Sequence, residues 1–224
     1  ADLSQAEARI VAYIAREDRM INVFKSGEDI HKYNASIIFN KHPKDILPSE
    51  RQIAKNRVHG ANYRIGPAKA AKLAGTTEEK AREDLNKYKA RFPNLEIWWR
   101  NVEEQIGKTR VMSNYFGRKR MFFGRWGHEL VNEAIAYYPQ STVGDLLNLG
   151  IIRCYPNLPP DWALLIQNHD SIAAQVPKET PPMHIYKFFK HYFEIPLTIY
   201  GKTYIIPIDI KVGENWGVMK NLEI

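Results

Sequence analysis

Cysteine is almost absent from this 224-residue sequence, in which Cys154 stands alone. One cysteine excludes an internal disulfide and a zinc site built from several thiolates, and it is consistent with a reducing compartment. No run approaches the ~20 apolar residues that a membrane-spanning helix needs, and no secretory or transit peptide is visible. We therefore expect no membrane partner and turn to what the sequence does contain.

Charge is unevenly distributed along the chain. The formal net charge is +7, and apolar residues make up 44% of the sequence, as in ordinary globular proteins. Residues 51–120 hold 17 Lys and Arg against 7 Asp and Glu, a net charge of +10. A basic middle third favours a polyanionic partner such as nucleic acid or nucleotide. A solvated helical surface is the open alternative.

Helical patterns fill the first half of the chain. Ser4 with Glu7 forms a capping box before the first helix, and Thr76 with Glu79 forms another before a helix that ends near Arg91. Further helices are expected at 28–39, 48–63, 93–110 and 182–193, and one or two helices are expected within 128–155.

Strand patterns fill much of the second half. A turn at 115–118 separates two short strands, the second at 121–123, and later strands are expected at 162–166, 172–176, 195–200 and 204–212. The sequence predicts an α+β fold with a mainly antiparallel sheet and a helical, basic middle.

One predicted helix carries a basic stripe. Arg51, Lys55 and His59 are spaced four residues apart, and Tyr63 follows one turn later. Arg51 and His59 lie roughly 12 Å apart along such a helix, which suits an extended triphosphate and its sugar. An exposed basic helix with no ligand has the same pattern, so the spacing alone leaves both interpretations open.

Two carboxylates occupy notable positions. Asp2 begins the first segment, and Asp170 follows His169 at the tip of a predicted hairpin. A carboxylate at such a tip is commonly a turn residue. On adjacent strands, two such carboxylates could instead hold two Mg²⁺ ions for an in-line phosphoryl displacement.

The order of these motifs resembles family A DNA polymerases, of the bacterial repair or phage type. Residues 2–9, Asp-Leu-Ser-Gln-Ala-Glu-Ala-Arg, resemble the first palm motif of that family, and Arg51-xxx-Lys55-xxx-His59-Gly60-xx-Tyr63 resembles its fingers-helix motif. His169-Asp170 resembles the core of the third motif. Further similarities in the same order are Asp29-Ile30-His31, Gly117-Arg118, Gln140 and Gly213-Glu214-Asn215-Trp216.

The resemblance implies a DNA-directed DNA polymerase that uses two Mg²⁺ ions, dNTPs and primer–template DNA. It also implies roles for single residues. Metal ligands would be Asp2, Asp170 and the backbone carbonyl of Leu3, with Lys55 as a further catalytic residue. The nucleotide would be bound by Arg51, Lys55, His59, Tyr63, His31, Gln5 and Glu7, the last as a steric gate against the ribose 2′-hydroxyl. Primer–template contacts would be Arg9, Gln140, His169 and Arg118.

The resemblance also implies a domain organisation. Residues 1–27 and 111–224 would form the palm, and residues 28–110 the fingers. In the family, the thumb and any exonuclease domain lie upstream of the first palm motif, so we expect an upstream segment or a partner chain to supply the thumb. The implied location is the cytoplasm of a bacterial or phage-infected cell, with an organelle as the open alternative.

Three positions depart from the family pattern, and two rival functions stay open. Ser171 stands where a Glu usually follows His-Asp, His59 replaces an aromatic Phe or Tyr, and Arg64 replaces the Gly after Tyr63. One rival is a single-subunit RNA polymerase, which shares the fingers helix but is expected to have a small residue in place of Glu7. The other is a DNA-binding fragment without catalysis.

Overall fold

The computed structural model describes residues 1–58 and 60–222, which form two compact units. We call residues 1–7 with 140–224 the sheet unit, and residues 8–139 the helical unit. The sequence-based boundaries at 27/28 and 110/111 follow the motifs, whereas the compact units follow packing. The functional division into palm and fingers therefore stays a prediction.

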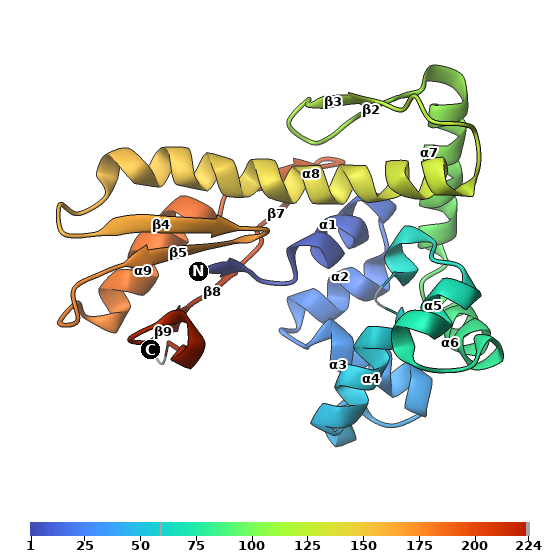
Figure 1. Ribbon diagram of the computed structural model, residues 1–224, viewed down its shortest axis with the longest axis horizontal. Helices are drawn as coiled ribbons and strands as arrows, with labels where there is room; N and C mark the ends of the chain where they lie inside the picture. Colours follow the sequence, from blue (N-terminus) through green and yellow to red (C-terminus); the bar gives the residue numbers. More distant parts are fainter. Residues whose placement is uncertain (59, 223–224) are drawn as a thin grey trace. The chain divides into compact units, whose positions relative to one another are not determined.

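The sheet unit is built on four antiparallel strands in the order β4-β5-β1-β8 (Figure 1). Their bounds are β4 Ala163–Asn168, β5 Ser171–Gln175, β1 Asp2–Leu3 and β8 Ile208–Asp209. Two-stranded ladders join β6 Leu197–Ile199 to β7 Lys202–Tyr204, and β9 Lys211–Val212 to β10 Lys220–Asn221. The antiparallel sheet of the α+β prediction is thus present, with strands shorter than expected in the last quarter of the chain.

Helix α9, Pro182–Phe193, supplies much of the core of the sheet unit. Its Phe189 and Phe193 are buried, and Phe188 and Phe189 contact the ring of Trp162. Gly150, on the long helix α8 His128–Cys154, lets Phe193 approach, because a Cβ at that position would lie 2.5 Å from the Phe193 ring. The aromatic residues of this region therefore form a packed core.

The helical unit contains most of the helices. Their bounds are α1 Ala6–Ala15, which starts in the sheet unit, α2 Asp18–Lys25, α3 Ile30–Phe39, α4 Pro48–Val58, α5 Pro67–Ala74, α6 Glu78–Arg91 and α7 Asn94–Thr109. The hairpin of β2 Val111–Ser113 and β3 Lys119–Met121 follows α7, and the first part of α8 completes the unit.

Several element boundaries correct the sequence-based ones. Helices α2 and α5 were not anticipated, because eight-residue helices show too few turns for a clear periodicity. Helix α4 ends at Val58 and not at Tyr63, since residues 61–63 form a separate 3₁₀ turn. The predicted strand 121–123 is shifted, and β3 ends at Met121.

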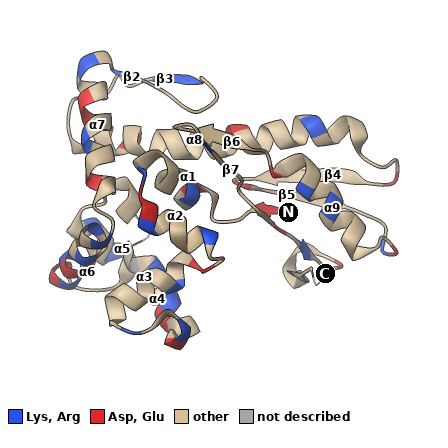
Figure 2. Ribbon diagram, turned by 180° about the vertical axis from the view of Figure 1, so that it is seen from behind, with Lys and Arg blue, Asp and Glu red and all other residues tan. Residues whose placement is uncertain are grey.

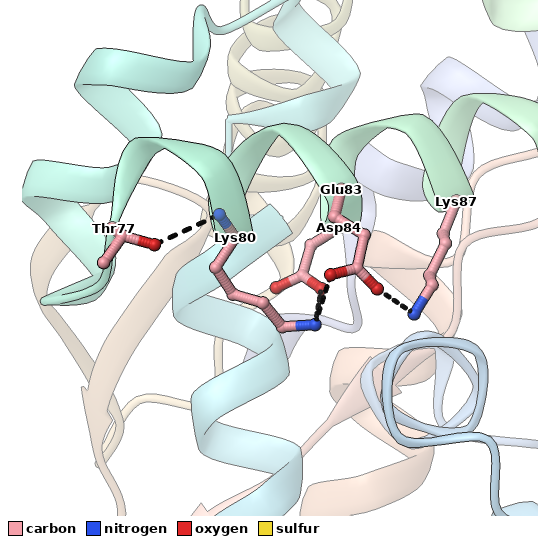
Figure 3. Close-up of polar contacts among 5 residues, drawn as sticks. All are labelled: Thr77, Lys80, Glu83, Asp84 and Lys87. Carbon is pink, nitrogen blue, oxygen red and sulfur yellow. Dashed lines mark hydrogen bonds and ion pairs between the residues drawn. The ribbon is translucent and has the colours of Figure 1, made fainter.

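Helix α6 shows how local chemistry fixes a helix in this unit. Thr77, and not Thr76 as predicted, is the N-cap, and its hydroxyl accepts a hydrogen bond from the Lys80 backbone N–H at 3.2 Å (Figure 3). Lys80 then pairs with Glu83 at 2.9 Å and with the fully buried Asp84 at 3.4 Å. Lys87 pairs with Glu83 at 2.7 Å. Pairs at this spacing stabilise a helix whose sequence is highly charged.

Candidate active site

The short strand β1 brings carboxylates together in the sheet unit. Asp2 lies directly opposite Ser171 on β5 and opposite Asp209 on β8. Directly opposed residues of an antiparallel ladder point to the same face of the sheet, so these three side chains share a face. Asp170 ends the β4–β5 turn, and its backbone carbonyl accepts a hydrogen bond from the Leu3 N–H at 3.0 Å.

This arrangement raises the pKa of Asp2 to about 6. The larger cause is partial burial, because the flanking strands remove part of the hydration of a side chain that still reaches solvent. The carboxylates of Asp170 and Asp209 add to the shift by repulsion. A cation bound beside these carboxylates would reduce the repulsion between their negative charges.

The oxygen ligands available around Asp2 indicate which metal ion this part of the sheet unit could hold. Among residues 1–58 and 60–222, no group of three or more His, Cys, Asp or Glu side chains is placed to hold a metal ion by itself. Two carboxylates and a backbone carbonyl do fit Mg²⁺, which usually takes few protein ligands and completes its shell with waters and substrate phosphates.

Sequence reasoning missed Asp209. Only the β1–β8 register, which no sequence motif marks, could have revealed it.

His169 links two of the predicted site residues. It adopts a left-handed backbone conformation with φ 55°. Its Nδ1 lies 3.3 Å from Asp170 Oδ1, and its Nε2 lies 3.3 Å from Oε1 of Glu7, at the start of α1. The Ser171 hydroxyl donates to the Asn168 carbonyl at 2.9 Å. Ser171 therefore closes the turn at the position where the family usually has a carboxylate.

In the helical unit, Asp29 connects Arg51 with the start of α3. Arg51 Nε donates to Asp29 Oδ2 at 2.6 Å. The other Asp29 oxygen caps α3 by accepting from the backbone N–H groups of His31 and Lys32. Partial burial opposes ionisation, but these hydrogen bonds outweigh it and lower the pKa of Asp29. Arg51 and His31, both predicted phosphate ligands, are thus held at one carboxylate.

Lys55 lies one turn after Arg51 on α4 and is half-buried. His59, the next member of the predicted stripe, lies outside the described residues.

The turn that carries Tyr63 is fixed by three helices. Asn62 accepts a hydrogen bond from Tyr88 of α6 at its side chain and one from the Trp99 indole of α7 at its backbone carbonyl. Arg64 adopts a left-handed conformation, φ 59°, where the family's Gly would be unstrained. Its guanidinium pairs with Glu103 of α7 at 2.7 Å, and its carbonyl accepts from Asn132 of α8 at 3.3 Å. The turn thus persists although Gly is absent.

The remaining predicted residues are distributed over both units. Arg9 is buried, with its guanidinium 4.5 Å from the centre of the Phe24 ring, which favours a supporting role in packing α1 against α2. Arg118 has an exposed side chain, and its carbonyl accepts from the Tyr137 hydroxyl at 2.7 Å. Gln140 is exposed on α8, and Gln5 precedes α1 with φ 51°.

The sheet unit therefore holds one group of predicted site residues: Asp2, Leu3, Gln5, Glu7, Gln140, His169 and Asp170. The helical unit holds the other described ones: Arg9, His31, Arg51, Lys55, Tyr63 and Arg118.

Comparison with known proteins assigns the fold and the family. The model of DNA polymerase family A matches residues 1–218, which is nearly the whole chain. The chain belongs to DNA polymerase family A. The thermostable DNA polymerase I of Thermus aquaticus is 26% identical over 222 residues, which cover 96% of this chain and 26% of the relative. DNA polymerase I of Chloroflexus aurantiacus is 26% identical over 234 residues, covering 99% of this chain and 24% of the relative.

A solved structure shares the fold. The polymerase domain of Pol1 from M. smegmatis, in complex with DNA primer–template and dNTP, superposes with a TM-score of 0.79 at 22% identity. The match covers 91% of this chain and 38% of that one. This family A chain thus spans about a quarter of the length of the two relatives above. No helix among the described residues is long and apolar enough to cross a membrane.

Proposed function

We propose that this chain carries the nucleotidyl-transfer centre of a template-directed DNA polymerase, which adds dNTPs to a primer 3′ end. The observation that supports this most strongly is the strand register that sets Asp2 beside the His169-Asp170 turn, in a chain whose family match runs from residue 1 to residue 218. Relatives of this chain are DNA polymerases I, and its structural neighbour is bound to primer–template and dNTP. A longer polymerase, with a thumb supplied upstream or by another chain, is part of the proposal.

Asp2, Asp170 and the Leu3 carbonyl would hold two Mg²⁺ ions in the sheet unit. When bound, such ions supply charge stabilisation for the attacking and leaving oxygens of an in-line displacement. Asp2 and Asp170 would hold the ions as carboxylates, and a bound cation would reduce the repulsion that adds to burial in raising the Asp2 pKa. His169 would orient the Asp170 carboxylate through the 3.3 Å contact.

Glu7 would act as the steric gate in the same unit. Its carboxylate is half-buried and contacts His169 at 3.3 Å, so the His169 ring restricts where it can move. A fixed side chain excludes a 2′-hydroxyl more effectively than a mobile one, because it cannot yield space. Gln5 would contact the nucleotide from the turn before α1, and His169 and Gln140 would contact primer–template DNA.

The nucleotide ligands of the helical unit would be Arg51, Lys55, His31, Tyr63 and His59. Arg51 offers a planar fork suited to a phosphate, and Lys55 offers a compact positive charge one turn away. Asp29 holds Arg51 in place at 2.6 Å until a phosphate competes for the guanidinium. Arg118 and Arg9 would serve primer–template binding, Arg9 from its buried position as a support. Residues 28–110 would be the fingers and the remainder the palm, in the cytoplasm of a bacterial or phage-infected cell.

Primer extension on a self-priming DNA hairpin tests the proposal. The chain, at micromolar concentration with Mg²⁺, should extend the hairpin with dNTPs and much less with NTPs. Equal use of both pools would favour the RNA-polymerase alternative. DNA binding without any extension, also after an upstream thumb segment is added, would favour the non-catalytic fragment.

A further inference from the structure

A cavity of about 340 Å³ lies within the helical unit, between α2, the start of α3 and the end of α6. A volume of this size suits a small organic molecule. The ribbon carries both basic and acidic segments beside α2 (Figure 2). We call the cavity the arginine pocket, and the polar and aromatic side chains in its lining are Arg19, Asn22, Ser26, Glu28, Tyr33 and Arg91.

Two arginines meet in the arginine pocket. Arg19 Nη1 donates to the backbone carbonyl of Arg91 at 2.7 Å, and Arg91 Nε donates to the Tyr33 hydroxyl at 2.6 Å. The Arg91 guanidinium also lies 5.2 Å from the centre of the Tyr33 ring. Because these contacts are made to a carbonyl and a phenol, they orient both guanidinium groups without neutralising their charge.

The charges in the lining are not balanced by one another. Arg19, Arg91 and Glu28 form no ion pair with any residue among 1–58 and 60–222, although all three line the same cavity. A guanidinium also has more N–H donors than the contacts above use. The arginine pocket therefore presents cationic donors and a carboxylate that are too far apart to pair with each other.

Two neutral side chains add further hydrogen-bonding groups to the lining. The Ser26 hydroxyl donates to the Val23 carbonyl at 2.9 Å, and its oxygen can still accept a hydrogen bond. Asn22 is exposed on α2, and its amide offers both a donor and an acceptor. The lining thus combines positive charge, one negative charge and neutral polar groups, which suits a ligand with chemically different ends.

We propose that the arginine pocket binds a small phosphate monoester whose body carries hydroxyl groups, as a sugar phosphate does. A phosphate monoester carries a charge of about −1.5 to −2 at neutral pH, which matches two guanidinium groups better than a single carboxylate does. Arg19 and Arg91 bind the phosphate oxygens, because a planar guanidinium presents paired N–H donors. Glu28 accepts hydrogen bonds from the hydroxyl groups and repels a second phosphate.

This site goes beyond the proposed nucleotidyl transfer. None of the residues in its lining is a metal, nucleotide or DNA ligand proposed above. A small ligand held there would occupy the helical unit at the same time as a nucleotide, since the two would contact different side chains.

Isothermal titration calorimetry with ribose 5-phosphate, without Mg²⁺, DNA or nucleotide, tests the proposal. Arg19→Gln and Arg91→Gln should each weaken binding about tenfold or more, since a hydrogen bond to a charged group contributes at least that factor. Arg19→Lys keeps the charge and should lose less affinity than Arg19→Gln. The matched control is Arg100→Gln, which removes an exposed arginine of α7 outside the pocket and should bind as the parent does. Circular dichroism of each variant checks that the fold is kept.

A comparison of ligands tests the role of Glu28. Ribose 5-phosphate should bind about tenfold more tightly than inorganic phosphate, because only the monoester offers hydroxyl groups to the carboxylate. Ribose without phosphate should not bind measurably. Glu28→Gln should strengthen the binding of inorganic phosphate, since a repelling charge is lost, and should reduce the preference for ribose 5-phosphate.

Three results would overturn the proposal. The first is equal affinity for inorganic phosphate and ribose 5-phosphate, which would show a contact with a bare anion. The second is a loss in Arg19→Gln and Arg91→Gln no larger than in Arg100→Gln. The third is loss of binding in Lys55→Ala, which would place the ligand at the proposed nucleotide site. Because the titrations involve no primer extension, this proposal and the proposed function can fail separately.

Discussion

The two compact units carry net charges of opposite sign. The helical unit holds 25 Lys and Arg against 15 Asp and Glu, a formal charge of +10, whereas the sheet unit holds 7 against 10, a formal charge of −3. A positive unit attracts polyanions over a distance of several ångströms, limited by salt screening. A negative one repels phosphates unless cations offset its carboxylates. Affinity for DNA and dependence on metal should therefore belong mainly to different units and should be separable by mutation.

The units also differ in how their functional side chains are held. In the sheet unit, backbone register sets Asp2 opposite Ser171 and Asp209, so the positions depend on strand pairing. In the helical unit, Arg51 is held by a side-chain pair with Asp29. Side-chain pairs exchange partners more readily than strands shift register, since a shifted strand turns every side chain to the other face. We therefore expect a preformed carboxylate site and adaptable phosphate ligands.

The largest expected effect is the loss of chemistry when the sheet unit loses a carboxylate. Asp170→Asn keeps the size of the side chain but removes the negative charge that would hold Mg²⁺. Primer extension should fall by about a thousandfold or more, as expected when electrostatic stabilisation of the transition state is removed. The affinity for duplex DNA should stay within about twofold of the parent's, because the helical unit keeps all of its positive charge. The control is Asp161→Asn, an exposed carboxylate in a loop of the same unit, and equal loss in both variants would contradict the assignment.

The converse change removes a positive charge from the helical unit. Lys55→Ala should lower the rate of nucleotide addition at saturating DNA by about 10- to 1000-fold, since charge on the transferring phosphate grows in the transition state. Rapid-quench measurement of single-nucleotide addition gives this rate directly. Lys69→Ala, an exposed lysine on α5, is the matched control. A change in DNA affinity alone, with an unaltered rate, would show that Lys55 contributes only to the general electrostatic attraction of DNA.

A third change tests selectivity inside the negative unit. Glu7→Ala should raise the use of NTPs relative to dNTPs by about 10- to 100-fold, because space opens where a 2′-hydroxyl would lie. Glu7→Gln keeps the bulk and should keep most of the discrimination. The ratio of kcat/KM for the two pools, measured with one template base, decides between them. If Glu7→Gln and Glu7→Ala relaxed the ratio equally, charge rather than bulk would be responsible.

Much of the fold could be predicted from the sequence, for reasons visible in particular elements. The long periodic segments gave helices α7 and α9, and Gly117 and Gly201, both with positive φ, mark hairpin turns that Gly signals predict. The sequence patterns do not predict the short helix α2, and they do not predict the residue at which α4 ends. Residues 61–63 leave the helix because Asn62 is bound by Tyr88 and Trp99, contacts from distant segments that no local pattern contains.

The candidate site divides in the same way. The motifs identified Asp2 and Asp170 by resemblance, but only strand pairing reveals Asp209 beside them. Likewise, β3 ends at Met121, so Phe122 and Phe123 do not continue the strand that the sequence predicts there. Long-range register and burial depend on tertiary packing, which overrides local propensity.

Arg64 offers a smaller test of how the helical unit fixes its site. Arg64→Ala should lower the free energy of unfolding by about 0.5–1 kcal/mol, because it loses the pair with Glu103 but keeps the left-handed backbone. Arg64→Gly loses the same pair but gains roughly 1 kcal/mol, since Gly adopts that backbone without strain. Urea denaturation followed by circular dichroism compares the two variants. Equal stability of Ala and Gly at this position would contradict the strained turn.

The smallest expected effect concerns the pH dependence of the sheet unit without metal. Because the pKa of folded Asp2 is raised to about 6 from an ordinary value of 3.8, the folded chain binds a proton more tightly than the unfolded one. Stability should therefore be unaffected by Asp2 below about pH 4, should decline as the pH rises from 4 to 6, and should stay lowered above 6. Solvent screening at this accessible side chain limits the penalty to about 1 kcal/mol.

Asp2→Asn isolates this penalty, because it keeps the shape of the side chain and cannot ionise. At pH 7.5 in EDTA, the variant should melt about 2–4 °C above the parent, and near pH 4 the two should melt together. Added Mg²⁺ should raise the melting temperature of the parent and not that of the variant, since an ion offsets the repulsion between Asp2 and its neighbours Asp170 and Asp209. Asp209→Asn should give a weaker effect of the same sign, because repulsion is secondary to burial. A melting difference that is the same at both pH values would show that ionisation of Asp2 does not destabilise the folded sheet unit.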